Sequence, residues 1–410
     1  FFDPVARAWW HAQQDALLEM GVAGWKLDFG DEYVLDDPIL TDAGPVSKQE
    51  YSEAYYRDFY EYGIHKRGHE DFVTMVRGWD ESYGWEGRFF ARPEHAPVVW
   101  AGDNRRDWVG LSDALDHIFR SAAAGYVVVG SDLGGYLDRD DADLQVLVPF
   151  DRVNFLRWLA VSALNPFMQL HGRANLAPWS LPDDPSPERS IELYRYWAHL
   201  HTELIPFFYS LAEEAYAGNT PPILRPVGTV ETWAGDYRYT LGDALLVAPI
   251  LDGTGAREVA LPDGDWFDWW TGERFDGMTA VSRDYATDLQ KIPVFVKDGA
   301  IIPLAATTQV TAVTEGHFDA ATTVLAWPSN AGTEFVLHDE DGMTTTLATA
   351  ESDAAATFDA TRAARRLIVR LHAPQGTNAV SSNGAPLSEV ADQAALAAAD
   401  GYLVDGDFVW

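Results

Sequence analysis

The spacing of apolar residues predicts two kinds of structure along this chain, helices alternating with short strands first and strands alone afterwards. Asp3 and Pro4 suit the first positions of a helix, because an Asp side chain accepts hydrogen bonds from free N–H groups and proline fits the first turn. Apolar residues then recur at helical spacing until Gly21, where we expect this helix to end.

Short apolar runs bounded by glycine or polar residues follow this helix and predict strands. The runs at 25–29, 72–76, 98–100, 126–129 and 167–170 are separated by helical patterns at 47–62, 111–123, 151–163 and 190–216. Strands that alternate with helices at this spacing favour a parallel sheet with crossover helices.

Polar residues gather where these strands end. They are Asp28, Arg77, Asp103, Asp132 and His171. This pattern is typical of a (β/α)8 barrel, in which the chemistry lies at the carboxyl ends of the strands. Five strand–helix units are visible, so we expect strands 4 to 8 of a barrel whose first three units are missing from this chain. An open parallel sheet with a crevice at its switch point is the competing fold.

The pattern changes after Thr220, where short β runs are separated by Gly, Pro and Asp. The runs are at 237–240, 244–247, 258–261, 292–296 and 300–302, and the next helical stretch is at 387–399. We therefore expect α/β plus all-β structure: a partial (β/α)8 catalytic barrel over 1–220, a proximal β-sandwich over 221–305 and a distal β-sandwich over 306–410. The Ala/Thr-rich stretch 305–321 marks the last boundary.

The charge balance limits the partners of this protein. Its 410 residues hold 29 Lys and Arg against 63 Asp and Glu, a formal net charge of −34. Such a field repels phosphate backbones and anionic lipid, so nucleic acid and membrane surfaces are not expected as partners. The apolar runs are shorter than the roughly 20 residues that span a bilayer.

Other features of the composition narrow the chemistry. The chain has no Cys, which excludes disulfides, thiolate metal sites and a cysteine nucleophile. The histidines form no ligand-spaced pair, so no metal or other cofactor is predicted. Phe1 is not an initiator Met and 1–20 lack the order of a signal peptide, so we expect the chain to begin inside a longer protein. A cytoplasmic location is slightly favoured, and the oligomeric state, including a homo-oligomer, stays open.

Two strand-end carboxylates suit glycoside hydrolysis. Asp28 is followed by Phe29 and Gly30, which leave little backbone in the way, and Asp103 follows Trp100 by three residues. Glycoside hydrolysis needs one ionised carboxylate and one that holds a proton, and an apolar ring beside a carboxyl raises its pKa. A helix cap or an ion pair is the alternative role for each of these residues.

Aromatic residues crowd the same part of the sequence, at Trp25, Phe29, Trp79, Trp85, Trp100 and Trp108. Flat rings of this kind either stack on sugars or fill a core.

A second polar group follows later strands. Asp132 precedes Gly134, Gly135 and Tyr136, and two glycines allow backbone and carboxylate to approach one ligand closely. His171 either bonds a substrate hydroxyl or is a satisfied core histidine.

These motifs, in this order, resemble glycoside hydrolase family 31, the retaining α-glycosidases. Trp25–Glu32 resembles the family's Lys-Thr-Asp-Phe-Gly-Glu segment, and Trp100–Asp103 its Trp-x-Gly-Asp segment. Ser131–Tyr136 resembles its Asp-Ile-Gly-Gly-aromatic segment, and Leu170–Arg173 its His-Gly segment.

The resemblance continues into the second half of the chain. The segments Leu224–Pro226, Leu241–Pro249, Leu261–Gly272 and Ile292–Leu304 resemble the family's proximal β-sandwich. The resemblance implies Asp28 as the nucleophile and no metal.

The resemblance also implies roles for the other strand-end residues. Asp103 would be the general acid and then the base, while Asp132 and His171 would bind sugar hydroxyls. Phe29, Trp100 and Tyr136 would line the same substrate site.

The family also places an arginine about sixteen residues before the acid/base, and here the spacing differs. Arg77 lies 26 positions before Asp103 and Arg92 lies 11 before it. We favour Arg77, because an apolar strand leads directly into it, and interpret 79–97 as a lengthened loop.

The implied function is a retaining α-glycosidase that acts on terminal α-linked sugars of an oligosaccharide or glycoside, with α-glucosidase as the leading activity. Sulfoquinovosidase, α-xylosidase and α-galactosidase specificity stay open, as do transglycosylase and lyase chemistry. A non-catalytic carbohydrate-binding fragment is the alternative, because part of the pocket would come from the N-terminal part of the same protein. Oxygens of Asp28 and Asp103 more than about 7 Å apart would contradict the double displacement.

Overall fold

The computed structural model describes residues 1–30, 34, 37–84, 86–173, 176–305, 321–361, 366–374 and 376–410. The chain divides into two compact units. Unit 1 contains Phe1–Trp158, Asn165–Ala177 and Gly228–Tyr237, and unit 2 contains Leu159–Leu164, Pro178–Val227 and Arg238–Trp410.

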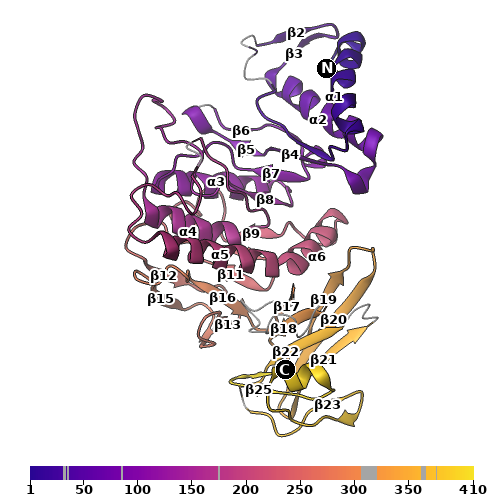
Figure 1. Ribbon diagram of the computed structural model, residues 1–410, viewed down its shortest axis with the longest axis vertical. Coiled ribbons are helices and arrows are strands. Elements are labelled where there is room, and N and C mark those ends of the chain that lie inside the picture. Colours follow the sequence, from indigo (N-terminus) through magenta and orange to yellow (C-terminus); the bar gives the residue numbers. More distant parts are fainter. Residues whose placement is uncertain are drawn as a thin grey trace. The chain divides into compact units, whose positions relative to one another are not determined.

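A four-stranded parallel sheet organises unit 1, with the order β1-β4-β7-β8. Its strands are β1 (Gly24–Lys26), β4 (Val73–Arg77), β7 (Val98–Trp100) and β8 (Val129–Gly130), and Figure 1 shows β4, β7 and β8 as neighbours. Because all four strands are parallel, their carboxyl ends lie at one edge of the sheet. The predicted parallel sheet is confirmed, and this edge carries the predicted polar residues.

The last predicted strand, 167–170, is reduced to one parallel bridge between Asp132 and Gln169 among the described residues. The backbone still pairs with the previous strand, because Phe167 N–H donates to the carbonyl of Val129 (3.3 Å) and Leu133 N–H to that of Gln169 (3.0 Å). This segment therefore brings its side chains to the same edge.

The helices of unit 1 begin where capping residues predict. Helix α1 (Pro4–Glu19) is capped by Asp3, whose Oδ1 accepts from Val5 N–H at 2.8 Å. Helix α2 (Lys48–Arg67) has a capping box in which Ser47 and Glu50 bond each other's backbone N–H groups. The remaining elements of this unit are α3 (Trp108–Ala123), β2 (Ile39–Thr41), β3 (Gly44–Val46), β5 (Trp79–Asp80), β6 (Arg88–Phe89), η1 (His69–Asp71), η2 (Ser82–Gly84) and η3 (Pro93–His95).

Helix α4 (Arg152–Ala163) follows, and the predicted single helix over 190–216 is two helices in unit 2. They are α5 (Pro187–Glu203) and α6 (Ile205–Tyr216). The break falls at Leu204, directly before Ile205 and Pro206, because proline lacks the N–H that a continuous helix would use.

The rest of unit 2 consists mainly of β-sheets, together with the short helix α7 (Gln393–Ala398). A six-stranded antiparallel sheet has the order β14-β13-β16-β11-β10-β9, and β12 pairs with β15. The strands are β9 (Leu224–Pro226), β10 (Tyr239–Leu241), β11 (Leu245–Val247), β12 (Ala256–Ala260), β13 (Asp265–Asp268), β14 (Arg274–Asp276), β15 (Ala280–Asp284) and β16 (Val294–Lys297).

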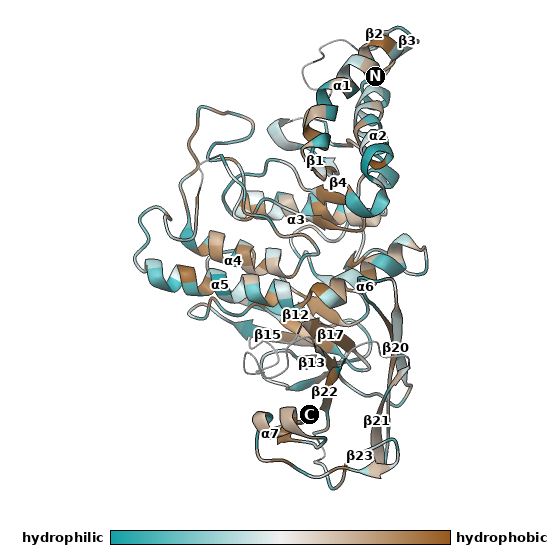
Figure 2. Cartoon of the chain, turned by 45° about the vertical axis from the view of Figure 1, so that its right-hand side comes forward, coloured by the Kyte–Doolittle hydropathy of each residue, from teal (hydrophilic) through white to brown (hydrophobic). Residues whose placement is uncertain are grey.

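The C-terminal part of unit 2 holds a five-stranded sheet, β17-β18-β22-β26-β25, and a three-stranded sheet, β19-β20-β21. Strand β22 is brown in Figure 2, whereas the polar helix α2 is largely teal. The remaining elements are β17 (Ile301–Ala305), β18 (Thr322–Ala326), β19 (Thr333–His338), β20 (Thr344–Ser352), β21 (Ala355–Thr361), β22 (Leu367–His372), β23 (Ser381–Ser382), β24 (Ala385–Pro386), α7 (Gln393–Ala398), β25 (Val404–Asp405) and β26 (Phe408–Val409).

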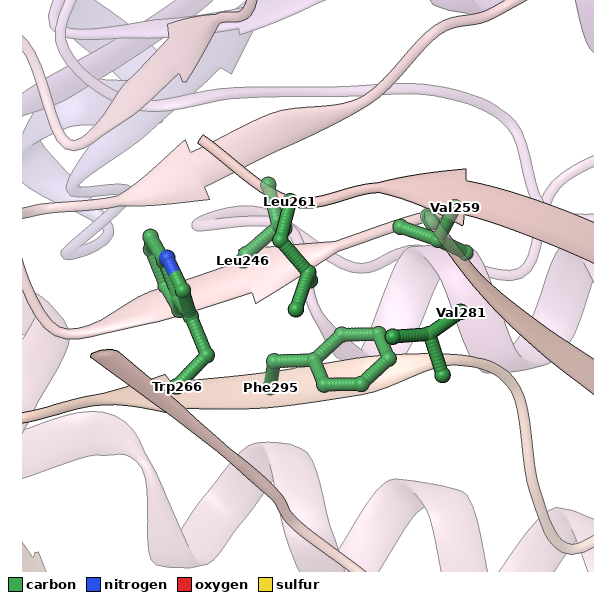
Figure 3. Packing of buried hydrophobic residues seen from close by; sticks show 7 residues of the cluster. Leu246, Val259, Leu261, Trp266, Val281 and Phe295 are labelled. Atoms are coloured by element: carbon green, nitrogen blue, oxygen red, sulfur yellow. The ribbon is translucent and has the colours of Figure 1, made fainter. Parts of the chain in front are cut away.

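A cluster of buried apolar residues forms the core of the first β part of unit 2 (Figure 3). Side chains from the six-stranded sheet face others from the β12–β15 pair and from the segment after β12. We call this group the Trp266 core, and its buried members are Leu246, Ala248, Val259, Leu261, Trp266, Val281 and Phe295. Burying each large side chain stabilises the fold by about 1.5–3 kcal/mol.

Within the described ranges, no helix is both long and apolar enough to cross a membrane.

Candidate active site

The side chain of Arg77 organises the carboxyl edge of the sheet in unit 1. Arg77 is the last residue of β4 and its side chain is fully buried. Its Nε donates to Asp28 Oδ1 at 2.5 Å, its Nη2 to Asp103 Oδ1 at 2.7 Å, and its Nη1 to Asp80 Oδ2. One guanidinium thus binds three carboxylates, and we call these four residues the Arg77 cluster.

This arrangement limits the distance between the two predicted carboxylates. Arg77 Nη2 lies 3.3 Å from Asp28 Oδ2 and 2.7 Å from Asp103 Oδ1, so these oxygens are no more than about 6 Å apart. The structure therefore brings together the first three strand-end residues that the sequence predicted.

Asp28 is the more accessible of the two carboxylates. It lies two residues after β1, and 37% of its side chain is exposed, against 8% for Asp103. The next residue, Phe29, has a left-handed backbone (φ 50°), and its ring lies 4.3 Å from the Arg77 guanidinium carbon. At Gly30 a Cβ would lie 2.3 Å from the Tyr55 ring, so the turn after Asp28 requires glycine.

Asp103 is held by a tight turn after β7. Gly102 has φ +77°, and a Cβ there would lie 2.3 Å from the carboxyl carbon of Asp80. The N–H of Asp103 donates to Ser82 Oγ at 3.1 Å, and its Oδ2 accepts from the Tyr83 hydroxyl at 2.5 Å. Burial raises the pKa of Asp103, while Arg77 opposes this shift. The two carboxylates thus differ in exposure and in surroundings, as the sequence predicted.

Asp132 lies after β8 and is almost completely buried. Its Oδ1 accepts from the Gln169 amide, and its Oδ2 has no hydrogen-bond partner among the described residues. Burial raises the pKa of Asp132 to about 7. A Cβ at Gly135 would lie 2.5 Å from the Arg105 carbonyl, which explains the second glycine of this segment.

His171 and Tyr136 lie together beside this carboxylate segment. Their ring centroids are 5.2 Å apart, and both residues line a small pocket with Leu133, Leu170 and Arg106. Burial lowers the pKa of His171. The neutral imidazole then offers one donor and one acceptor to this pocket.

Trp100 is fully buried, so its ring has no exposed face in this structure. The Lys26 ammonium lies 4.4 Å from the ring centroid and the Arg77 guanidinium carbon 5.2 Å from it. The ring therefore acts on the site through these two cations.

Arg92, the alternative pocket arginine, lies elsewhere. Its side chain is 59% exposed and its Nε donates to Glu53 at 2.6 Å. Of the two candidate arginines, Arg77 is the one that contacts the carboxylates. Glu32, which ends the motif that begins at Trp25, and Trp85 lie outside the described residues.

Sequence reasoning missed three residues that complete this site. Asp80 is fully buried against Arg77, while Ser82 and Tyr83 contact Asp103. All three lie in the segment that was interpreted as a lengthened loop, which in fact holds the β5–β6 pair. One feature of the sequence could have identified Asp80: it lies three residues after Arg77, a spacing at which a tight turn brings the two side chains together.

The described part of the chain holds no group of three or more His, Asp or Glu side chains placed to bind a metal ion.

Two family profiles match the chain. Residues 1–211 match the glycosyl hydrolases family 31 TIM-barrel domain, and residues 221–302 match the glycosyl hydrolase family 31 C-terminal domain.

Curated relatives and solved structures agree with these matches. The chain is 25% identical over 357 residues to alpha-glucosidase 2 of Bacillus thermoamyloliquefaciens, covering 84% of this chain and 42% of the relative. It is 28% identical over 309 residues to the 1,3-alpha-isomaltosidase of Kribbella flavida, covering 71% and 39%. The cycloalternan-forming enzyme of Listeria monocytogenes has the same fold, with a TM-score of 0.82 at 22% identity over 99% of this chain and 38% of that one. The chain thus spans less than half the length of these relatives.

Proposed function

We propose, from the premise that this chain belongs to glycosyl hydrolase family 31, that it carries the two catalytic carboxylates of a retaining α-glycosidase. Asp28 is the nucleophile and Asp103 the general acid and base. The observation that carries this proposal is the sharing of the Arg77 guanidinium by both carboxylates.

The separation of the carboxylates supports retention over inversion. Retaining glycosidases place them about 5–5.5 Å apart, whereas inverting enzymes need about 6.5–9.5 Å to admit a water molecule. An upper limit of about 6 Å between Asp28 Oδ2 and Asp103 Oδ1 lies below the inverting range.

The first step forms a covalent intermediate. An oxygen of ionised Asp28 attacks the anomeric carbon, and the bond from that carbon to the leaving oxygen breaks. Asp103 gives its proton to the leaving oxygen and becomes a carboxylate. The burial that raises the pKa of Asp103 favours the protonated form that this step needs.

The second step reverses these roles. The Asp103 carboxylate takes a proton from water, the water oxygen bonds to the anomeric carbon, and Asp28 leaves as a carboxylate. Arg77 touches both carboxylates, so its charge is available to whichever is ionised at each stage.

The remaining residues bind the sugar. Asp132 presents a buried oxygen without a hydrogen-bond partner, which suits a sugar hydroxyl as donor. His171 and Tyr136 line a pocket together, and the Phe29 ring borders the nucleophile. Several relatives are named as glucosidases or an isomaltosidase, so an α-linked glucoside is the leading substrate, with α-xyloside second because one relative is an alpha-xylosidase.

Mechanism-based labelling tests the proposal. The protein is incubated with 5-fluoro-α-glucosyl fluoride and with the xylosyl analogue, digested, and analysed by mass spectrometry for the modified peptide. We expect the label on Asp28 and none in the Asp28→Asn variant, which should retain the wild-type melting curve. Attachment to another carboxylate would contradict the assignment, and absence of both labelling and turnover of aryl α-glycosides would favour a carbohydrate-binding role.

A further inference from the structure

We propose that Tyr83 is a positioning residue for the acid/base, fixing the Asp103 carboxyl and favouring its ionised form. This inference rests on the proposed function of Asp103. The contact that carries it is the hydrogen bond of 2.5 Å from the Tyr83 hydroxyl to Asp103 Oδ2.

Each oxygen of Asp103 has its own donor. Arg77 Nη2 donates to Oδ1 at 2.7 Å, and Tyr83 donates to Oδ2 at 2.5 Å. Two donors on opposite oxygens prevent rotation of the carboxyl group about its last bond. Tyr83 therefore fixes Oδ2, while Arg77 binds Oδ1.

A turn built on Asp80 holds Tyr83 in this position. Asp80 Oδ1 accepts from the N–H of Ser82 at 2.8 Å and from its hydroxyl at 2.5 Å. The same Ser82 Oγ accepts from the N–H of Asp103 at 3.1 Å, so the turn is tied to the acid/base twice. Asp80 is in turn bound by Arg77, which joins the turn to the Arg77 cluster.

The backbone of Tyr83 is in the left-handed region, with φ 62° and ψ 19°. This conformation costs a residue with a side chain roughly 1–2 kcal/mol, and glycine would adopt it freely. A tyrosine here is explained by its hydroxyl, which the turn places on Asp103.

The charges around Asp103 determine whether the Tyr83 hydroxyl keeps its proton. The titratable groups that act on Asp103 come from the strand ends, the β5 turn and the loops after β8: Arg77, Tyr83, Asp28, Asp80, Asp132, Tyr136 and His171. Burial and the charge of Asp103 raise the pKa of Tyr83 far above its usual value. The hydroxyl therefore stays protonated at every working pH and acts as a donor.

A donor to Oδ2 stabilises the ionised carboxylate more than the protonated acid. Asp103 must lose its proton in the first step and take one from water in the second. Without the Tyr83 hydroxyl, Asp103 would hold its proton to higher pH and would be a weaker acid in the first step.

The pH profile of the Tyr83→Phe variant tests this role. We expect the basic limb of kcat/KM, which reports loss of the Asp103 proton, to move up by about one pH unit. The matched control is Tyr62→Phe, which removes a tyrosine–carboxylate bond of the same length, to Asp15 between α2 and α1. An unchanged limb in Tyr83→Phe, or an equal shift in Tyr62→Phe, would overturn the proposal.

A second measurement separates this inference from the proposed function. The carboxyl carbons of Asp are labelled with ¹³C and titrated by NMR, with Asp103→Asn identifying the signal. We expect Asp103 to titrate about one pH unit higher in Tyr83→Phe than in wild type, whether or not the protein turns over a given glycoside. Equal titration midpoints would refute the role of Tyr83, whereas a raised midpoint without any glycosidase activity would refute only the proposed function.

Discussion

The Arg77 cluster of unit 1 centres on a fully buried guanidinium and the Trp266 core of unit 2 is buried throughout, and the two are built from opposite kinds of side chain. The Trp266 core buries apolar residues, and the removal of each of these side chains from water stabilises the folded protein. The Arg77 cluster buries one guanidinium against Asp28, Asp80 and Asp103, and each charge loses hydration.

From this difference we expect the Trp266 core to serve stability and the Arg77 cluster to serve the proposed chemistry. Replacing buried ion pairs by apolar side chains of similar volume is often neutral or stabilising, so a charged cluster is weak evidence for stability. Three carboxylates around one guanidinium also leave excess negative charge, which favours a proton on one of them. We therefore expect changes in the Arg77 cluster to reduce turnover, and changes in the Trp266 core to reduce the free energy of unfolding.

The largest effect is expected from Asp103→Ala. Substrates with poor leaving groups should lose roughly 10²- to 10⁴-fold in kcat/KM, because they need a donated proton. Glycosyl fluorides, which need little protonation, should lose far less. Steady-state kinetics on a series of leaving groups measures the difference. Equal losses on both classes of substrate would show that Asp103 is not the acid.

Phe295→Ala is the corresponding change in the Trp266 core. Phe295 is completely buried, and truncating a buried phenylalanine costs about 3–5 kcal/mol. Urea unfolding should show this loss, while kcat/KM below the unfolding transition should stay near the wild-type value. A variant that keeps its stability and loses turnover would reverse the contrast drawn between the two regions.

Asp132→Asn is expected to change how stability depends on pH. Burial raises the pKa of Asp132 from its usual 3.8 to about 7 in the folded protein, so the fold binds a proton that the unfolded chain has released. The proton bound by Asp132 contributes its full stabilisation of the folded state below about pH 4, and this stabilisation is lost as the pH rises through about 7. Asparagine is uncharged, like the protonated carboxyl, and its side-chain oxygen can still accept the hydrogen bond from the Gln169 amide.

Melting or urea unfolding between pH 4 and pH 8 measures this effect. We expect the variant to match wild type near pH 4 and to become more stable than wild type by a few kcal/mol near pH 8. A stability difference that does not vary with pH would contradict the raised pKa of Asp132.

The sequence was sufficient for those parts of the fold in which local chemistry decides. The cap at Asp3, the strand at Val98–Trp100 and the parallel order of the sheet follow from spacing and capping residues. The same reasoning placed Asp28 and Asp103 at one edge, since the ends of parallel strands meet. Pro206 is a signal for a helix break, but the apolar pattern continues across it, so the sequence predicted one helix where there are two.

The residues that were missed lie in a segment whose local signal was weak, the spacing of Asp80 three residues after Arg77. Asp80 and Tyr83 lie in a turn with two short strands, β5 and β6, of two residues each, too short for periodicity to show. Asp80 binds Arg77, three residues before it, whereas Tyr83 binds Asp103, twenty residues after it. The contact of Tyr83 with Asp103 depends on the assembled sheet, because Asp103 follows β7, which pairs with β4 beside this turn.

Arg92→Ala should have the smallest effect and sharpens the choice between the two arginines. Arg92 is largely exposed and pairs with Glu53, and exposed ion pairs contribute little to stability. We expect an unfolding midpoint that cannot be distinguished from wild type and a kcat/KM within about two-fold of it. Arg77→Lys is the matched change in the Arg77 cluster, because an ammonium cannot reproduce a planar fork that reaches three carboxylates. It should reduce kcat/KM far more than Arg92→Ala does, and the opposite ranking would show that the pocket arginine is Arg92.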